Sequence, residues 1–202
     1  MIKTIFYARH GETEWNRIGR FQGHSDIPLN ENGLSQARQL QILMNGWRPE
    51  VFVSSDLIRA QQTARIANSN LQVPHLIDHR LREIHLGVAE GKTLVEVESL
   101  FGQKAIQDWV SPHPDLSGFS FPEGETKLDS VLRIKSFLET LLVQLPYSTV
   151  AVVGHGGTLK RFCHHIAEDK TKAFPIPNCC VYQIQFNVLT REWSNERLIS
   201  PL

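Results

Sequence analysis

Two histidines follow apolar segments of this sequence and lie beside glycine. Residues 4–8 (TIFYA) lead to His10, and residues 149–153 (TVAVV) lead to His155, which Gly156 follows. Short apolar runs rich in strand formers predict buried strands, and parallel strands end at one edge of a sheet. A glycine lets a ligand approach the backbone, and the N-terminus of a following helix favours an anion. The pattern predicts an anion-binding site at that edge.

Arginines and a carboxylate are predicted at the same edge. Arg9 directly precedes His10, and Arg59 falls in the first turns of the helix after a strand at residues 51–54. Guanidinium groups bind phosphate oxygens with two N–H groups and keep their charge. With His155 as a further donor, these residues predict a pocket for a phosphate monoester.

The chemistry that this set predicts is phosphoryl transfer. A neutral imidazole at His10 can attack phosphorus, and a phosphohistidine divides one difficult displacement into two easier ones. Glu83, after a third extended segment at residues 75–77, is placed to protonate the leaving oxygen. The alternative for Glu83 is a plain ion pair with Arg80 or Arg82. The side chains supply the positive charge themselves, so we expect no metal and no cofactor.

The order of elements predicts an α/β fold. Strands at residues 4–8, 51–54, 75–77 and 149–153 alternate with helices, which favours a three-layer α/β/α sandwich with a mostly parallel sheet. Residues 181–188 alternate apolar and polar side chains, as a late antiparallel strand does, and residues 191–199 can pair with it. We expect one domain over residues 1–202, with a small lid at about residues 93–125.

Turn-forming residues predict where the helices end. Asn32-Gly33 predicts a break before a helix that runs from residue 34 to 44 and stops at Gly46. Ser55 or Asp56 is the expected cap of the next helix, at residues 57–68.

Composition excludes some function classes. The 21 Lys and Arg balance the 21 Asp and Glu, so no basic footprint for nucleic acid is present. No apolar stretch reaches the length of a membrane helix, and three cysteines do not make a disulfide framework. We expect a cytoplasmic protein with no membrane partner. Pairs such as His75 with His79 lack further ligands for a metal.

Six segments together resemble the histidine phosphatase superfamily, also called phosphoglycerate mutase-like. They are RHGETEWN from Arg9, PLNENGLSQAR at residues 28–38, SSDLIRAQQTA at residues 54–64, LREIHLGVAEG at residues 81–91, FPEGET at residues 121–126 and VVGHGG at residues 152–157. They occur in order over most of the chain, so the combined pattern is specific, whereas Arg-His-Gly alone is weak.

The resemblance implies roles for the residues that match. His10 is the nucleophile, Arg9, Arg59 and His155 form the phosphate pocket, and Glu83 is the proton donor. Asn16 matches a position that touches the phosphate, and Gln22 and Gly23 match the loop that borders the substrate. We also expect Gly156 at the phosphate and His85 as a further substrate donor. Ala89 stands where many relatives have an aromatic residue, which predicts a wider pocket.

The resemblance leaves three functions open. A phosphatase of small phosphorylated metabolites is the first, with α-ribazole phosphatase as the first specific candidate. The second is a phosphoglycerate mutase, although mutases of this family generally carry longer insertions than 202 residues allow. The third is an inactive module that binds phosphorylated ligands. The alternating strand at residues 181–188 could also pair across a homodimer.

Overall fold

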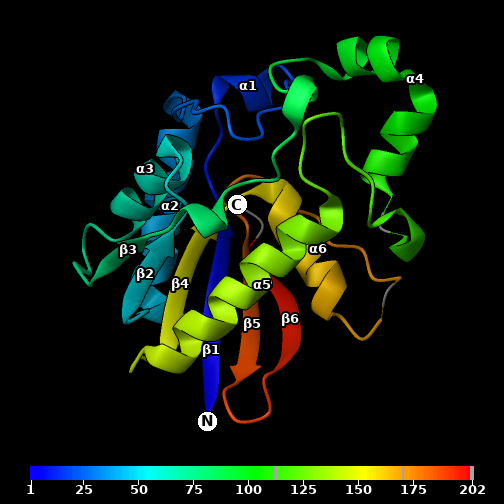
Figure 1. The fold of residues 1–202 in the computed structure, drawn as a ribbon. Coiled ribbons are helices and arrows are strands. Elements are labelled where there is room, and N and C mark those ends of the chain that lie inside the picture. The colour runs from blue at the N-terminus through cyan, green and yellow to red at the C-terminus, as the bar shows by residue number, and fades with distance from the viewer. Residues whose placement is uncertain (112, 170, 201–202) are drawn as a thin grey trace.

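A six-stranded sheet forms the centre of the computed structural model, which describes residues 1–111, 113–169 and 171–200. The strands lie in the order β3-β2-β4-β1-β5-β6 (Figure 1). Strands β3, β2, β4 and β1 run parallel to one another. Strand β5 pairs antiparallel with β1 on one side and with β6 on the other. Their bounds are β1 Ile2–Arg9, β2 Val51–Ser54, β3 His75–Ile77, β4 Thr149–Gly154, β5 Val181–Asn187 and β6 Glu192–Ser200. The predicted mostly parallel sheet with a late antiparallel hairpin is confirmed.

Helices cover both faces of this sheet. The α-helices are α1 Glu14–Arg17, α2 Glu31–Trp47, α3 Ile58–Ala67, α4 Leu94–Val110, α5 Lys127–Gln144 and α6 Gly156–Ile166, with short 3₁₀ turns at η1 His79–Leu81, η2 Gly87–Ala89 and η3 Pro114–Leu116. Successive side chains of a strand point to opposite faces. On β1, Tyr7 packs beneath α5 and α6, and Phe6 packs beneath α2 and α3. The result is the predicted three-layer sandwich.

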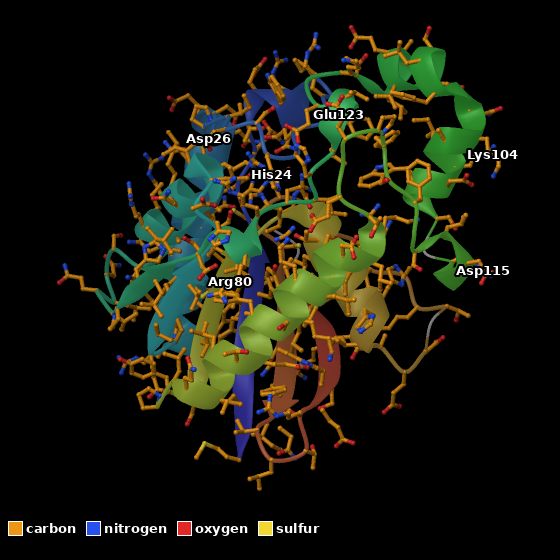
Figure 2. All side chains as sticks on the ribbon, viewed as in Figure 1. His24, Asp26, Arg80, Lys104, Asp115 and Glu123 are labelled. Atoms are coloured by element: carbon orange, nitrogen blue, oxygen red, sulfur yellow. The ribbon has the colours of Figure 1, made fainter. Side chains whose placement is uncertain are left out.

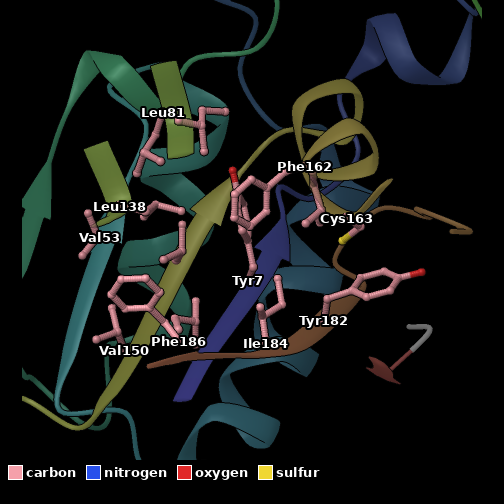
Figure 3. Close-up of a cluster of buried hydrophobic side chains, with 14 of the residues drawn as sticks. Tyr7, Val53, Leu81, Leu138, Val150, Phe162, Cys163, Tyr182, Ile184 and Phe186 are labelled. Carbon is pink, nitrogen blue, oxygen red and sulfur yellow. The ribbon is translucent and has the colours of Figure 1, made fainter. Parts of the chain in front are cut away.

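The larger of the two cores lies under α5 and α6. Figure 3 shows Tyr7, Val53 and Val150 from three adjacent strands together with Leu138 of α5 and Phe162 of α6, and all five are buried. Close packing across strands and helices holds the strand ends in fixed positions. The residues that follow those ends are therefore positioned by the core.

Two glycines that predicted helix ends lie inside α2. The helix begins earlier, after Asn30, whose side chain accepts a hydrogen bond from Gly33 N at 2.8 Å. A Cβ on Gly33 would lie 2.0 Å from the carbonyl oxygen of Glu12, so this glycine allows close packing instead of breaking the helix. The helix also passes Gly46 and ends at Trp47, and Arg48 directly after it adopts the left-handed conformation.

The predicted cap of α3 was wrong. The N-cap residue is Leu57, without a side-chain hydrogen bond, and the carboxylate of Asp26 accepts from Ile58 N at 2.6 Å. Asp56 instead binds Arg82, with its Oδ2 2.7 Å from the guanidinium. The side-chain acceptor at the start of α3 therefore comes from Asp26, which is distant in sequence, and not from Ser55 or Asp56.

Strand β5 lies inside the sheet and cannot pair across a dimer. It hydrogen-bonds to β1 on one side and to β6 on the other. The outer strands of the sheet in the described part of the chain are β3 and β6. The expected use of residues 181–188 in a homodimer is thus incorrect.

The segment expected to be a lid forms a separate small cluster. Helix α4 projects from the body of the molecule and bends where Gly102 has φ +82° (Figure 1). Phe101, Trp109 and, from the loop after α1, Phe21 pack around Phe121. None of the helices in the described residues is both long and apolar enough to span a membrane.

Candidate active site

The carboxyl ends of β1 and β4 bring the two Gly-flanked histidines together. Arg9 pairs with Gly154 in the parallel register, so His10 and His155 are the next residues on both strands. Their ring centroids lie 5.2 Å apart with an interplanar angle of 62°. They stand at the base of a cleft of about 460 Å³ that His10 lines, while His155 is fully buried beside it. The sheet edge predicted to bind an anion therefore carries a cleft.

The imidazole of His10 is held in one tautomer. Its Nδ1 lies 2.7 Å from the carbonyl oxygen of Gly11. A carbonyl only accepts, so Nδ1 carries the proton and Nε2 keeps a free electron pair. Burial, followed by the positive charges of Arg59 and Arg9, lowers the pKa of His10 well below its usual value. The ring is neutral at pH 7, as a nucleophile must be.

Arg59 and His155 form a buried pair with fixed hydrogen bonds. Arg59 Nε donates to His155 Nδ1 at 3.3 Å, which leaves the proton of the neutral ring on Nε2. That Nε2 is buried without a hydrogen-bond partner in the described residues, as a donor kept for a ligand would be. Burial also lowers the pKa of His155 well below its usual value.

The guanidinium of Arg59 is held by the loop after α1. Its two terminal nitrogens donate to the carbonyl oxygens of Ser25 at 2.7 Å and Gly23 at 2.8 Å. Burial lowers the pKa of Arg59 to about 10, so the group stays charged at neutral pH. The guanidinium is fully buried, and its hydrogen-bond partners are neutral, so it can pair with an anion in the cleft.

Arg9 supplies the second guanidinium of the cleft. One terminal nitrogen donates to Ile176 O at 2.7 Å, and its Nε is buried without a partner in the part of the chain that the structure describes. A Cβ on Gly156 would lie 2.9 Å from that Nε. The glycine after His155 therefore makes room for the arginine beside it.

Glu83 lies on the wall of the cleft, at the N-terminus of α6. Its oxygens accept hydrogen bonds from Gly157 N and Thr158 N, both at 2.8 Å, and from Ile84 N at 3.0 Å. The alternative ion pairs are not formed, because Arg80 binds Asp78 and Arg82 binds Asp56. The carboxylate is thus held by backbone N–H groups within the cleft.

Three of the less central predicted residues also line the cleft. Asn16 Oδ1 accepts from Thr13 N and from the Asn178 amide, both at 3.2 Å. Gln22 accepts from the Thr13 hydroxyl at 3.0 Å, and Gly23 has φ +50°. Their contact with a substrate stays a prediction.

Other predicted residues lie elsewhere. His85 lies beside His24, with ring centroids 4.8 Å apart and an interplanar angle of 49°, and is not among the residues that line the cleft. Ala89 is fully buried in the small hydrophobic cluster around Phe121 and does not line the cleft, so it does not widen the pocket. His24, labelled in Figure 2, donates a hydrogen bond from Nε2 to the Glu83 carbonyl oxygen, 2.9 Å away.

Sequence reasoning missed two cations on α6. Lys160 and Arg161 both line the cleft. The helix that carries them begins at Gly156, directly after His155. Helical spacing by four residues from Gly156 reaches Lys160 and then His164, and this spacing was the signal available in the sequence.

Comparison with known proteins agrees with this geometry. Residues 5–195 match the histidine phosphatase superfamily (branch 1). The chain belongs to this superfamily. The match includes every strand of the sheet except parts of β1 and β6 at the two ends.

Individual relatives of this superfamily member carry different names. The probable phosphoglycerate mutase GpmB of Serratia proteamaculans (strain 568) is 34% identical over 153 residues, which covers 75% of this chain and 69% of that protein. Bacillus stearothermophilus YhfR superposes with a TM-score of 0.85 at 28% identity, over 99% of this chain and 98% of that one. The α-ribazole phosphatase of Shigella flexneri gives 0.81 at 25%, over 98% and 96%.

The described residues do not form a cluster suited to a metal ion. No group of three or more His, Cys, Asp or Glu side chains in residues 1–111, 113–169 and 171–200 has the arrangement of a metal site. The positive charges that line the cleft come from side chains, Arg9 and Arg59 among them. These charges can stabilise a transferring phosphoryl group.

Proposed function

We propose that this protein hydrolyses small phosphate monoesters through a phosphohistidine at His10. The observation that carries the proposal is the state of His10 itself. It is a neutral imidazole with Nδ1 bound to Gly11 O and Nε2 free, between two arginines and beside an unpartnered His155 Nε2–H. That arrangement binds a phosphate and presents an electron pair to it.

The first step breaks the phosphorus–oxygen ester bond. His10 Nε2 forms a bond to phosphorus, and the leaving oxygen takes a proton from Glu83. Arg9, Arg59 and His155 carry the charge of the three remaining oxygens through N–H groups. Because backbone N–H groups hold the Glu83 carboxylate, the protonated side chain gives up one of these contacts to reach the leaving oxygen.

The second step returns the enzyme to its starting state. Water attacks the phosphohistidine, and Glu83, now ionised, accepts a proton from it. The nitrogen–phosphorus bond breaks, inorganic phosphate leaves, and Glu83 is again protonated for the next turnover. All atoms in this cycle come from the ester, water and the side chains.

Turnover of p-nitrophenyl phosphate in EDTA tests the proposal. We expect hydrolysis that survives chelation, is lost in His10→Ala, and is kept in His79→Ala, which removes an exposed histidine. A wild-type protein that hydrolyses no phosphate ester but binds phosphorylated ligands would contradict the proposal and favour the binding-module alternative.

The physiological ester is a narrower question. The likeness to the Shigella flexneri α-ribazole phosphatase makes α-ribazole 5′-phosphate the first natural ester to test. A kcat/KM for it far above those of simple sugar phosphates would support this candidate. A kcat/KM for α-ribazole 5′-phosphate equal to or lower than those for simple sugar phosphates would exclude it as the physiological substrate.

Mutase activity is a second candidate, because sequence relatives are named as probable phosphoglycerate mutases. A mutase returns the phosphoryl group from His10 to another oxygen of the substrate and excludes water meanwhile. Interconversion of 2- and 3-phosphoglycerate, primed by the bisphosphate, would support it. Release of inorganic phosphate without interconversion would exclude it.

A further inference from the structure

One wall of the cleft continues outward from the phosphate pocket along helix α6. Gly156, Lys160 and His164 follow each other at intervals of four residues, and all three line the cleft. Residues four apart share one face of a helix and lie about 6 Å apart along its axis. Lys160 therefore stands roughly one turn beyond the phosphate pocket on a face exposed to the same ligand.

The charge along this wall exceeds what one phosphate needs. The residues that line the cleft include five cations, Arg9, Arg20, Arg59, Lys160 and Arg161, and one carboxylate, Glu83. The whole chain by contrast has no net charge. Arg9 and Arg59 match a dianionic phosphate, and Arg20 has Glu96 3.5 Å away. Lys160 and Arg161 are the two lining cations that neither the cleaved phosphate nor an ion pair accounts for.

Among the described residues, no carboxylate is hydrogen-bonded to Arg161. Its terminal nitrogens donate to two backbone carbonyls, Gly157 O at 3.1 Å and Trp109 O at 2.9 Å. The guanidinium carbon lies 4.0 Å from the centre of the Trp109 ring. Burial lowers the pKa of Arg161 to about 10, which leaves it charged at neutral pH. Neutral hydrogen-bond partners fix its position, and the carboxylate whose charge acts on it is Glu83, which the proposed mechanism already uses.

Lys160 is the more available of the two cations. Its ammonium group has no hydrogen bond or ion pair with any residue that the structure describes. The cleft is also lined by apolar residues from the end of α4 and from the loop before β5, namely Trp109, Val110, Phe174, Pro175 and Ile176. Apolar neighbours weaken solvent screening and strengthen the attraction between Lys160 and an anion.

From this geometry we infer that the cleft has a second anionic subsite, formed by Lys160 and supported by Arg161. The inference rests on the proposed phosphatase function and narrows its substrate. The preferred substrate is a small phosphate monoester that carries a second anionic group, a carboxylate or another phosphate, a few bonds from the phosphate that is cleaved. An uncharged leaving group, such as the nucleoside of α-ribazole 5′-phosphate, leaves this subsite unused.

A matched pair of esters tests the subsite. Glycerol 3-phosphate and 3-phosphoglycerate share a three-carbon skeleton, and a carboxylate replaces a neutral hydroxymethyl group in the second. Glycerol 1,3-bisphosphate carries a second phosphate where 3-phosphoglycerate carries the carboxylate. Comparison of these two esters shows which of the two anions the subsite prefers. Release of inorganic phosphate gives kcat/KM for each ester. We expect the wild type to favour at least one anionic ester about tenfold or more, as a charge-assisted hydrogen bond does.

Variants at Lys160 give the specific readout. Lys160→Met should lose most of that preference, measured as the ratio of kcat/KM for the anionic ester to kcat/KM for glycerol 3-phosphate, and Lys160→Arg should restore it. Lys104→Met is the matched control, since Lys104 lies on the outer side of α4 with 82% of its side chain exposed (Figure 2). An equal preference in wild type and Lys160→Met, or a wild type that favours glycerol 3-phosphate, would overturn the inference.

Binding separates this inference from the proposed function. In the His10→Ala background, which forms no phosphohistidine, calorimetric titration compares 3-phosphoglycerate with glycerol 3-phosphate. Tighter binding of the anionic ester that disappears with Lys160→Met supports the subsite even if no ester is hydrolysed. Equal affinities would overturn the subsite even if p-nitrophenyl phosphate is turned over.

Discussion

The reactive residues of this site are fixed by backbone groups. His10 Nδ1 is bound to the carbonyl oxygen of Gly11, and the carboxylate of Glu83 is bound to the N–H groups of Gly157 and Thr158. Backbone partners have no rotamers to lose, so they preorganise a side chain at little entropic cost. The nucleophile and the proton donor therefore keep their orientation before any substrate arrives.

Glu83→Gln tests the role of proton donor through the leaving group. The amide is similar in shape and cannot supply a proton. We expect kcat for glycerol 3-phosphate to fall by about 10²- to 10⁴-fold, as for the loss of a general acid. The fall for p-nitrophenyl phosphate should be much smaller, because p-nitrophenolate leaves without a proton.

The comparison needs a control outside the cleft. Glu98→Gln removes an exposed carboxylate of α4 and should leave both rates unchanged. Equal losses for the two esters in Glu83→Gln would contradict proton donation to the leaving oxygen. They would indicate instead that Glu83 only positions its neighbours.

Sequence reasoning identified the residues that stand at strand ends. Arg9 and His10 follow an apolar strand directly, so the parallel sheet fixes their place without knowledge of distant contacts. The prediction that His85 contacts the substrate failed because its side chain turns toward His24 and Glu90. That direction depends on packing between loops. The carbonyl groups that hold Arg59 come from another loop in the same way.

At the scale of elements, the first turn of α6 positions the proton donor. A Cβ on Gly157 would lie 2.7 Å from Glu83 Oε1. Gly157→Ala should therefore displace the carboxylate and lower kcat for alkyl esters in the direction of the Glu83→Gln variant. The measurement is steady-state turnover of glycerol 3-phosphate, with the midpoint of thermal unfolding recorded to show that the variant is folded.

Gly46→Ala is the matched substitution. A Cβ at Gly46 meets no atom within 4 Å, and the residue lies within α2. Alanine in place of this glycine, in the last turn of the helix, should raise stability by up to about 1 kcal/mol and leave turnover unchanged. A Gly157→Ala enzyme as active as Gly46→Ala would show that the contact between α6 and Glu83 does not matter for the reaction.

Element boundaries were harder to predict than the elements. Strands such as β3 were predicted with the observed bounds because apolar runs between turn residues mark them. Gly33 was interpreted as a breaker, but it serves close packing of α2 against Glu12. Some glycines are needed because a neighbouring group packs where a Cβ would lie, and others because the backbone adopts a conformation that other residues avoid. The sequence does not distinguish these two cases.

For the molecule as a whole, the two buried histidines of the site make the free energy of unfolding depend on pH. His10 and His155 are buried and neutral, with pKa values well below those of the unfolded chain, about 6.5. Below that pH the unfolded state binds protons that the folded state does not. The free energy of unfolding therefore falls as the pH drops below about 6.5, and it keeps falling until the lowered folded values are reached.

Urea unfolding in phosphate-free buffer checks this dependence. Two such histidines give a slope of up to about 2.7 kcal/mol per pH unit. His10→Asn keeps a side-chain donor for Gly11 O and removes one titrating group, so its slope should be about half as steep. A stability that does not change between about pH 7 and pH 5.5 would contradict the buried neutral state of the two rings.

The central claim is that phosphoryl transfer passes through His10. The most direct test is to mix the protein with a phosphate ester, quench within the first turnovers at high pH, and locate the phosphoryl group by peptide mass spectrometry. The account predicts an acid-labile phosphoryl group on the peptide that contains His10, absent from His10→Ala and present in His79→Ala. Hydrolysis without label on His10, or with label on another residue, would contradict it.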